Sequence, residues 1–199
     1  MTNQSHLHSY IERAKNRLDE IDASIAHFEA RAQDVQSEAR AKADVAIAKM
    51  KSNRDAYQAW VAENQEIGEL VTAEAREDLQ AEWAKFEDNV MAYFDAAAGM
   101  YEKDKAYFQV RIEALKDAWE KTMERVKKTA KTFQASSKAE VDAAVAKLEK
   151  NADIANAKLK DLNKAGSASW VAVRDALSAS RAAFDKALDE TQSAFKKAM

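Results

Sequence analysis

Apolar residues recur along the first part of the chain at intervals that alternate between four and three. The run contains Leu7, Ile11, Ala14, Leu18, Ile21, Ile25, Phe28, Ala32, Val35 and Ala39. This spacing fills positions a and d of a heptad repeat, and it lasts for more than about four heptads. The pattern predicts an α-helix with one apolar stripe, as found in coiled coils.

Two further runs have the same spacing. One contains Leu79, Trp83, Phe86, Val90, Tyr93 and Ala97 and resumes at Phe108, Ile112, Leu115, Trp119, Thr122, Val126 and Phe133. The other contains Val141, Val145, Leu148, Ala152, Ala155, Leu159 and Leu162, then Trp170, Val173, Leu177, Phe184, Leu188 and Phe195. The chain has no proline and only three glycines, and long helices need few turns. The sequence therefore predicts an all-α fold.

Two turns divide the chain into three predicted helices. Gly68 precedes Thr72, which suits a helix N-cap, and Ser137 with Glu140 has the spacing of a capping box. We expect helices over about residues 4–66, 72–134 and 137–198, each about 93 Å long at 1.5 Å per residue. Their equal lengths predict one elongated domain over residues 1–199. The expected fold is a long antiparallel three-helix coiled-coil bundle, a rod that runs up, down and up.

The apolar spacing changes to consecutive fours near the middle of each predicted helix. These steps span residues 35–43, 97–105 and 162–170. Folding at the first turn places residue i of the first predicted helix beside about residue 138 − i of the second. Folding at the second turn places residue i of the second helix beside about residue 271 − i of the third. The three steps then lie at one level, where the supercoil would unwind locally. The alternative is a break of the third helix at Gly166, with Ser169 as the next N-cap.

The residue types needed for several kinds of active site are missing or badly spaced. The chain has no cysteine, and His6, His8 and His27 lack the spacing of metal ligands. A coiled coil fills its axis with its own side chains, so it offers no dry pocket for acid–base catalysis. Trp60, Trp83, Trp119, Trp170, Phe108 and Phe184 fall mostly on the apolar stripes, which favours core packing over a ligand groove or lipid insertion. We expect no enzyme activity, no cofactor and no metal.

The sequence also bears on cellular location. Its N-terminus lacks the positive start and apolar core of a signal peptide. The most apolar stretch, residues 90–101, is much shorter than the ~20 residues of a membrane span. We expect a cytoplasmic protein without a transmembrane segment.

Charge is distributed unevenly along the chain. Residues 63–88 contain nine acidic and two basic residues, and residues 121–138 contain six basic residues and one acidic residue. In the predicted rod these segments lie at opposite ends. The basic residues expected to bind a partner are Lys121, Arg125, Lys127, Lys128, Lys131 and Lys138. The partner would be the acidic end of another copy or an anionic surface, whereas compensation of helix dipoles and solubility are the alternative explanation.

The segment Ala165-Gly-Ser-Ala-Ser-Trp170 and the Ala-rich stretch after it, 174–185, resemble Ala-rich coiled-coil proteins of unassigned function in proteobacteria. In composition the whole chain is similar to phasins and exchangeable apolipoproteins, helical proteins that coat lipid. This resemblance implies a surface coat and assigns no functional residue.

The predicted function is a structural or scaffolding protein that acts through self-association or a protein partner. The alternative is a coat on a lipid or granule surface, for which the bundle opens near Gly99 and Gly166. Nucleic-acid binding by the basic segment is disfavoured, because Phe133 is the one aromatic residue there that could stack on a base.

Overall fold

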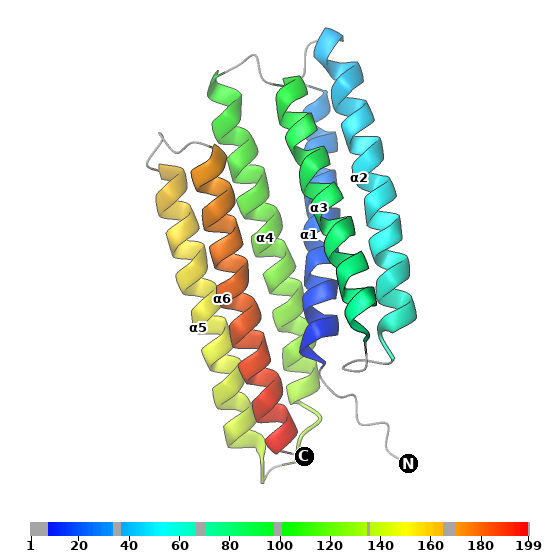
Figure 1. The fold of residues 1–199 in the computed structure, drawn as a ribbon. Helices are drawn as coiled ribbons and strands as arrows, with labels where there is room; N and C mark the ends of the chain where they lie inside the picture. Colours follow the sequence, from blue (N-terminus) through cyan, green and yellow to red (C-terminus); the bar gives the residue numbers. More distant parts are fainter. Residues whose placement is uncertain are drawn as a thin grey trace. The chain divides into compact units, whose positions relative to one another are not determined.

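The computed structural model describes residues 8–33, 37–66, 71–97, 101–134, 136–164 and 170–198 (Figure 1). All regular secondary structure in these residues is helical. The helices are α1 (Ser9–Ala32), α2 (Ser37–Asn64), α3 (Ala73–Ala97), α4 (Tyr101–Ala130), α5 (Lys138–Lys164) and α6 (Trp170–Lys197). The predicted all-α class is confirmed.

The structure does not confirm the three-helix rod. Each predicted long helix corresponds to two shorter helices, separated at 33–36, 98–100 and 165–169. All three boundaries fall at or beside the steps of consecutive fours, so these steps coincide with helix ends. The third helix shows the consequence most clearly, because α5 and α6 pack against each other along their lengths (Figure 1). The chain thus reverses between Lys164 and Trp170.

A physical reason for these reversals lies in the apolar stripe. A step of consecutive fours shifts the stripe around the helix axis, so one straight helix would turn its apolar residues away from their partners. Reversal of the chain keeps both halves of the stripe buried. Gly99 and Gly166 lie outside the described residues.

The predicted turns between the long helices agree better with the structure. The backbone N–H of Ala75 donates to Thr72 Oγ1 at 3.2 Å, so Thr72 caps α3 as expected. Ser137 directly precedes α5 as expected. Its hydroxyl donates to the Ala198 carbonyl at 2.8 Å, and neither bond of the predicted capping box with Glu140 is present in the described residues. Gly68 lies outside the described residues.

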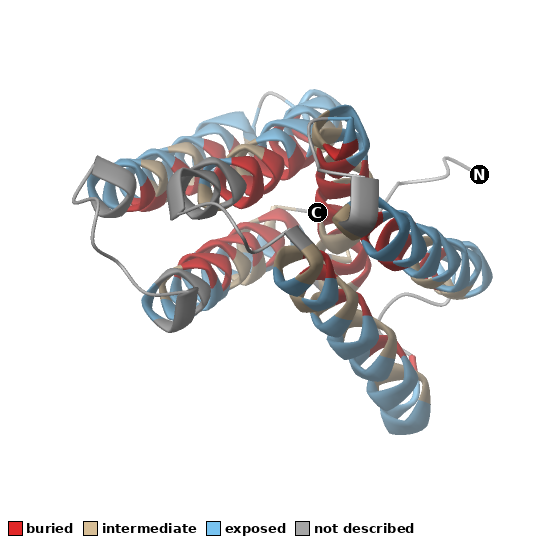
Figure 2. Cartoon of the chain, turned by 90° about the horizontal axis from the view of Figure 1, so that it is seen from above, coloured by how far each residue is buried: buried red, intermediate tan, exposed pale blue. Residues whose placement is uncertain are grey.

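The helices form two compact units. One unit comprises residues 14–118, which include most of α1, all of α2 and α3, and α4 as far as Ala118. The other comprises residues 1–13 and 119–199, which include the first turn of α1, the rest of α4, and α5 and α6. Helices α1 and α4 therefore contribute residues to both units. Figure 2 shows that the buried residues lie along one face of each helix, opposite exposed residues.

The unit formed by residues 14–118 has an aromatic core. Its fully buried side chains include Ile21, Phe28, Met50, Tyr57, Phe86, Val90, Tyr93 and Leu115. The rings of Phe28 and Tyr93 lie 4.6 Å apart, and the Tyr93 hydroxyl donates to the Phe28 carbonyl at 3.2 Å. The stripe residues of α1 and α3 therefore pack on each other, as their spacing predicts.

The unit formed by residues 1–13 and 119–199 has a second core. Its buried side chains include Ile11, Trp119, Val126, Val141, Leu148, Leu177, Phe184, Leu188 and Phe195. Trp119 stacks on Phe184 at 5.0 Å between ring centroids. These residues all belong to the predicted stripes, so the spacing identifies the core even though it misplaces the helix boundaries.

Candidate functional site

The structure places all six predicted partner-binding residues in the unit that contains residues 119–199. Arg125 points toward α1, where its Nε donates to Glu12 Oε2 at 2.8 Å. Its Nη2 also donates to Thr122 Oγ1 at 2.8 Å. The bond to Glu12 joins α4 to α1, and Glu12 is only 7 % exposed. Arg125 therefore has a structural contact that the sequence pattern did not indicate.

The remaining five residues are lysines with exposed side chains. Lys127 forms an ion pair with Glu149 of α5, and Lys138 pairs with Asp142 at 3.2 Å. Such exposed pairs contribute about 0–1 kcal/mol each, so a competing anion can replace them. Lys128 and Lys131 are exposed, and neither forms an ion pair within the described residues. These lysines make the end of α4 and the start of α5 strongly positive.

The end of α6 adds two lysines that the sequence analysis missed. The Ser137 hydroxyl donates to the Ala198 carbonyl at 2.8 Å, and the rings of Phe133 and Phe195 lie 4.9 Å apart. These contacts place the last turn of α6, with Lys196 and Lys197, beside the turn between α4 and α5. We define the basic surface as Lys127, Lys128, Lys131, Lys138, Lys196 and Lys197. In the predicted rod, the last two would lie at the far end.

Part of this positive charge has a structural explanation. Helices α4 and α6 both end at the basic surface, and both have lysines in their last turns. A cation near a helix C-terminus stabilises the helix by about 0.3–1 kcal/mol. Lys131 and Lys138 lie beyond the last turn of α4 and at the start of α5, where this effect does not explain them.

An acidic surface lies where α2 ends and α3 begins. The indole N–H of Trp60 donates to the Ala75 carbonyl at 2.8 Å, which brings the two helix ends together. The exposed carboxylates there are Glu63, Glu66, Glu74, Glu77 and Asp78, which we call the acidic surface. The predicted placement of basic and acidic segments at opposite ends depended on the three-helix rod, which the structure does not confirm.

Two other acids of the segment 63–88 have partners inside their own unit. Glu82 accepts hydrogen bonds from Lys85 and, at 3.1 Å, from Asn53 of α2. The bond from Lys85 is the largest cause that lowers the pKa of Glu82 below its ordinary value, while partial burial opposes it. Glu87 accepts a hydrogen bond from Arg111 at 2.7 Å. Neither carboxylate belongs to the acidic surface.

Arg111 is the centre of a buried polar network in the same unit. Its Nη1 donates to Ser24 Oγ at 2.6 Å, and its Nη2 lies 2.7 Å from Glu87 Oε1 and 3.2 Å from Glu20 Oε1. Arg111 and Glu20 are fully buried, and the guanidinium lies 5.2 Å from the centre of the Phe86 ring. The network joins α1, α3 and α4. An apolar spacing analysis cannot detect it, since its members stand beside the stripe.

Histidines and acids form no metal site in the described part of the chain. His27 lies 3.9 Å from Asp117, and no group of three or more metal-binding side chains occurs among the residues searched. His6 lies outside the described residues.

None of the described helices is long and apolar enough to cross a membrane. Comparisons with protein-family models, with curated proteins and with solved structures find no match to this chain.

Proposed function

We propose that this chain is a non-catalytic, cytoplasmic scaffolding protein whose copies associate by pairing the basic surface of one with the acidic surface of another. The observation that carries the proposal is the convergence of α4, α5 and α6 ends on one basic surface. Two segments that are distant in sequence contribute lysines to it, one from the end of α4 to the start of α5 and the other at the end of α6. The acidic surface offers five exposed carboxylates of complementary charge.

The strength of this association follows from exposure. Exposed ion pairs contribute about 0–1 kcal/mol each. Several such pairs support dissociation constants on the order of millimolar to micromolar. Screening shortens the range of these charges from about 10 Å at 0.1 M salt to about 3 Å at 1 M. The association is therefore weak, reversible and sensitive to salt, as suits a scaffold that assembles at high local concentration.

A non-catalytic function agrees with the way in which the interior is filled. Both cores consist of interlocking apolar side chains. Arg111 and Glu20 are both fully buried and form an ion pair with each other, so this pair holds α4 against α1. The carboxylates of the acidic surface are exposed to water.

A lipid or granule coat is the second candidate, and the hairpins favour it. The helix ends fall at the steps in the apolar stripe, so straightening each hairpin would produce the long helices over 4–66, 72–134 and 137–198. That opened form would turn apolar stripes outward. In the described residues only Val45 and Ile154 are large apolar side chains with high exposure, at 56 % and 46 %. The coat function therefore requires opening, whereas the scaffold function does not.

Sedimentation of charge-reversed variants tests the scaffold proposal. We expect the mass of the wild-type chain to rise with concentration at about 0.05 M salt and to fall to that of a single copy near about 0.5 M. The triple variant Lys128→Glu, Lys131→Glu, Lys197→Glu should remain a single copy. The matched control, Lys150→Glu, Lys158→Glu, Lys160→Glu on exposed positions of α5, should associate as the wild type does.

A reciprocal variant makes the test specific. Glu74→Lys, Glu77→Lys and Asp78→Lys should abolish association alone, and mixing this variant with the basic-surface variant should restore it. Association that is indifferent to salt and to both variants would rule out the proposal. Flotation of the wild type with anionic liposomes, without self-association, would instead favour the coat.

A further inference from the structure

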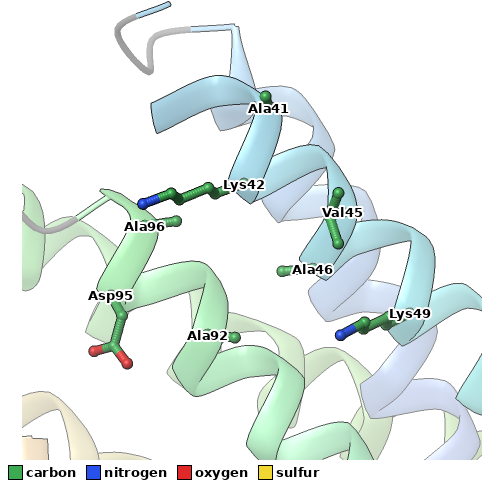
Figure 3. A pocket seen from close by; sticks show the side chains of 8 residues that line it. All are labelled: Ala41, Lys42, Val45, Ala46, Lys49, Ala92, Asp95 and Ala96. Atoms are coloured by element: carbon green, nitrogen blue, oxygen red, sulfur yellow. The ribbon is translucent and has the colours of Figure 1, made fainter. Parts of the chain in front are cut away.

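A groove lies between α2 and α3 in the unit formed by residues 14–118. Its volume is about 510 Å³, and Figure 3 shows the side chains that line it. They are Ala41, Lys42, Val45, Ala46 and Lys49 from α2, and Ala92, Asp95 and Ala96 from α3. The groove shares no residue with the basic or acidic surface, so an occupant of it would add to the proposed self-association.

Small side chains produce the groove. Farther along the same two helices the buried residues are larger, such as Tyr57 of α2 and Phe86 of α3, which are fully buried. At the groove the facing residues Ala46, Ala92 and Ala96 each offer one methyl group. Protein interiors are normally packed without voids larger than a water molecule. An apolar hollow with Val45 exposed at 56 % beside it is therefore suited to receive another side chain.

The polar contacts between α2 and α3 also stop short of the groove. Nearer the turn, Asn53 of α2 bonds to Glu82 and accepts a hydrogen bond from Asn89 at 2.7 Å. The side chains of the eight lining residues form no hydrogen bond or ion pair within the described part of the chain. Lys42, Lys49 and Asp95 therefore place three charges at the groove without using them to join the two helices.

The two lysines have a regular spacing. Lys42 and Lys49 are seven residues apart, which is about 10.5 Å along α2 and nearly the same side of the helix. In Figure 3, Lys42 extends across the groove toward Ala96, and Lys49 points into it toward Ala92. Val45 and Ala46 lie between the two lysines. The groove thus presents a positive group at each end of an apolar middle.

We propose that this groove binds an amphipathic helix of a partner protein that has two acidic residues seven positions apart with an apolar residue between them. A helix has the same rise as α2, so its acids would lie opposite Lys42 and Lys49. Its apolar side chain, at the third or fourth position, would then enter the alanine-lined middle. The partner helix would complete a three-helix arrangement on α2 and α3, a common mode of helix recognition.

Charge complementarity selects this occupant over an acyl chain. A fatty acid has one carboxylate, so it would match one of the two lysines and leave the other without an anion. Asp95 on the opposite helix would repel a second carboxylate on its own side and favour a lysine or arginine on that flank of the partner. A helix can present both signs on its two flanks, whereas an acyl chain cannot.

Binding of a designed peptide to the full chain tests the proposal. The probe is a labelled, Ala-rich helical peptide of three to four turns that contains Glu-x-x-Leu-x-x-x-Glu, with lysine on the other flank. Its matched control has lysine in place of both glutamates. We expect fluorescence anisotropy to show saturable binding of the acidic peptide and about tenfold weaker binding of the control.

Variants of the chain make the test specific to the groove. Lys42→Glu with Lys49→Glu should reverse the preference between the two peptides. Ala92→Trp, at an exposed position on α3, should fill the groove and abolish binding of both while circular dichroism stays unchanged. The control reversal Lys150→Glu with Lys158→Glu should have no effect.

Three results would overturn the proposal. The first is equal binding of the acidic and basic peptides, and the second is binding that survives Ala92→Trp. The third is displacement of the peptide by oleate at lower concentrations than by unlabelled peptide, which would assign the groove to an acyl ligand. The sedimentation variants change residues of the basic and acidic surfaces, and the peptide-binding variants change residues of the groove. Failure of one proposal can therefore be distinguished from failure of the other.

Discussion

Helices α1 and α4 are joined by an arginine in each of the two units, but the two arginines have different surroundings. In residues 14–118, Arg111 is fully buried and bonds to Glu20, Glu87 and Ser24. In the other unit, Arg125 has a side chain that is 31 % exposed, and it bonds to Glu12 and Thr122. Both arginines bond to a glutamate of α1, but the buried one also bonds to Glu87 of α3, so the two contacts differ in burial and in the number of carboxylate partners.

The comparison shows how a buried charge can specify a fold that apolar spacing leaves open. Glu87 and Arg111 belong to one predicted helix, where 24 residues would separate them by about 36 Å. They meet only because α3 ends and the chain reverses before α4. A rod without this reversal would leave Arg111 without Glu87, and a buried charge without its partner costs several kcal/mol. The partly exposed Arg125 has no such penalty, since water solvates it.

Removal of the buried arginine should have the largest effect on stability. Arg111→Met leaves the buried carboxylate of Glu20 without its cation, so we expect the free energy of unfolding to fall by about 3–5 kcal/mol. Urea denaturation followed by circular dichroism measures this loss. The triple variant Arg111→Met, Glu20→Met, Glu87→Gln should recover most of it, because no buried charge remains unpaired. A loss below about 1 kcal/mol in the single variant would remove the basis of the comparison.

Removal of the partly exposed arginine should have a smaller effect. Arg125→Met breaks its hydrogen bonds to Glu12 and Thr122, and we expect a loss of about 1–2 kcal/mol in the same denaturation experiment. Because α1 and α4 contribute to both units, we expect residues 1–199 to unfold as one domain in a single transition. Equal losses in the two variants would contradict the comparison of the arginines. Two separate transitions in either variant would contradict the expectation of one domain.

The spacing of apolar residues predicts the cores but does not distinguish the rod from the hairpins. Ile21, Phe86 and Phe184 are buried as their stripe positions require. The pairing of residue i with about 138 − i is also retained, since Asn53 bonds to Glu82 across α2 and α3, and Glu12 bonds to Arg125 across α1 and α4. Both pairs lie on either side of the turn between α2 and α3. The rod and the hairpin arrangement both satisfy the pairing of i with about 138 − i, so this pairing cannot distinguish the two folds.

The candidate site could be predicted only in part for the same reason. The sequence identifies Lys128 and Lys131 as exposed basic residues, and the structure agrees. It misses Lys196 and Lys197, because a continuous third helix would place its end far from Ser137. The alternative break at Gly166 contained the signal, since a hairpin there returns the end of α6 to the start of α5. Charge counting also cannot show that Arg125 bonds to Glu12.

An exposed ion pair within one helix extends the comparison to its weakest member. Glu82 bonds to Lys85 in the next turn of α3 and to Asn53, and its pKa is lowered from the ordinary value of 4.5, chiefly by the bond from Lys85. A lowered pKa in the folded chain means that the stabilisation is complete above about pH 4.5 and is lost as the pH falls through the folded value. Because Lys85 is largely exposed, we expect Glu82→Gln to reduce the free energy of unfolding by less than about 1 kcal/mol at pH 7.

The pH dependence separates this small charge effect from packing. The difference in unfolding free energy between the wild type and Glu82→Gln should shrink as the pH falls below about 4.5, because the carboxyl group becomes protonated and neutral like the amide. Glu77→Gln, at an exposed position of the same helix, is the matched control, and we expect its free energy of unfolding at pH 7 to be close to that of the wild type. A difference for Glu82→Gln that stays constant between pH 7 and pH 3 would show that the amide perturbs the contact with Asn53. The gradation from Arg111 through Arg125 to Glu82 would then not follow burial of charge alone.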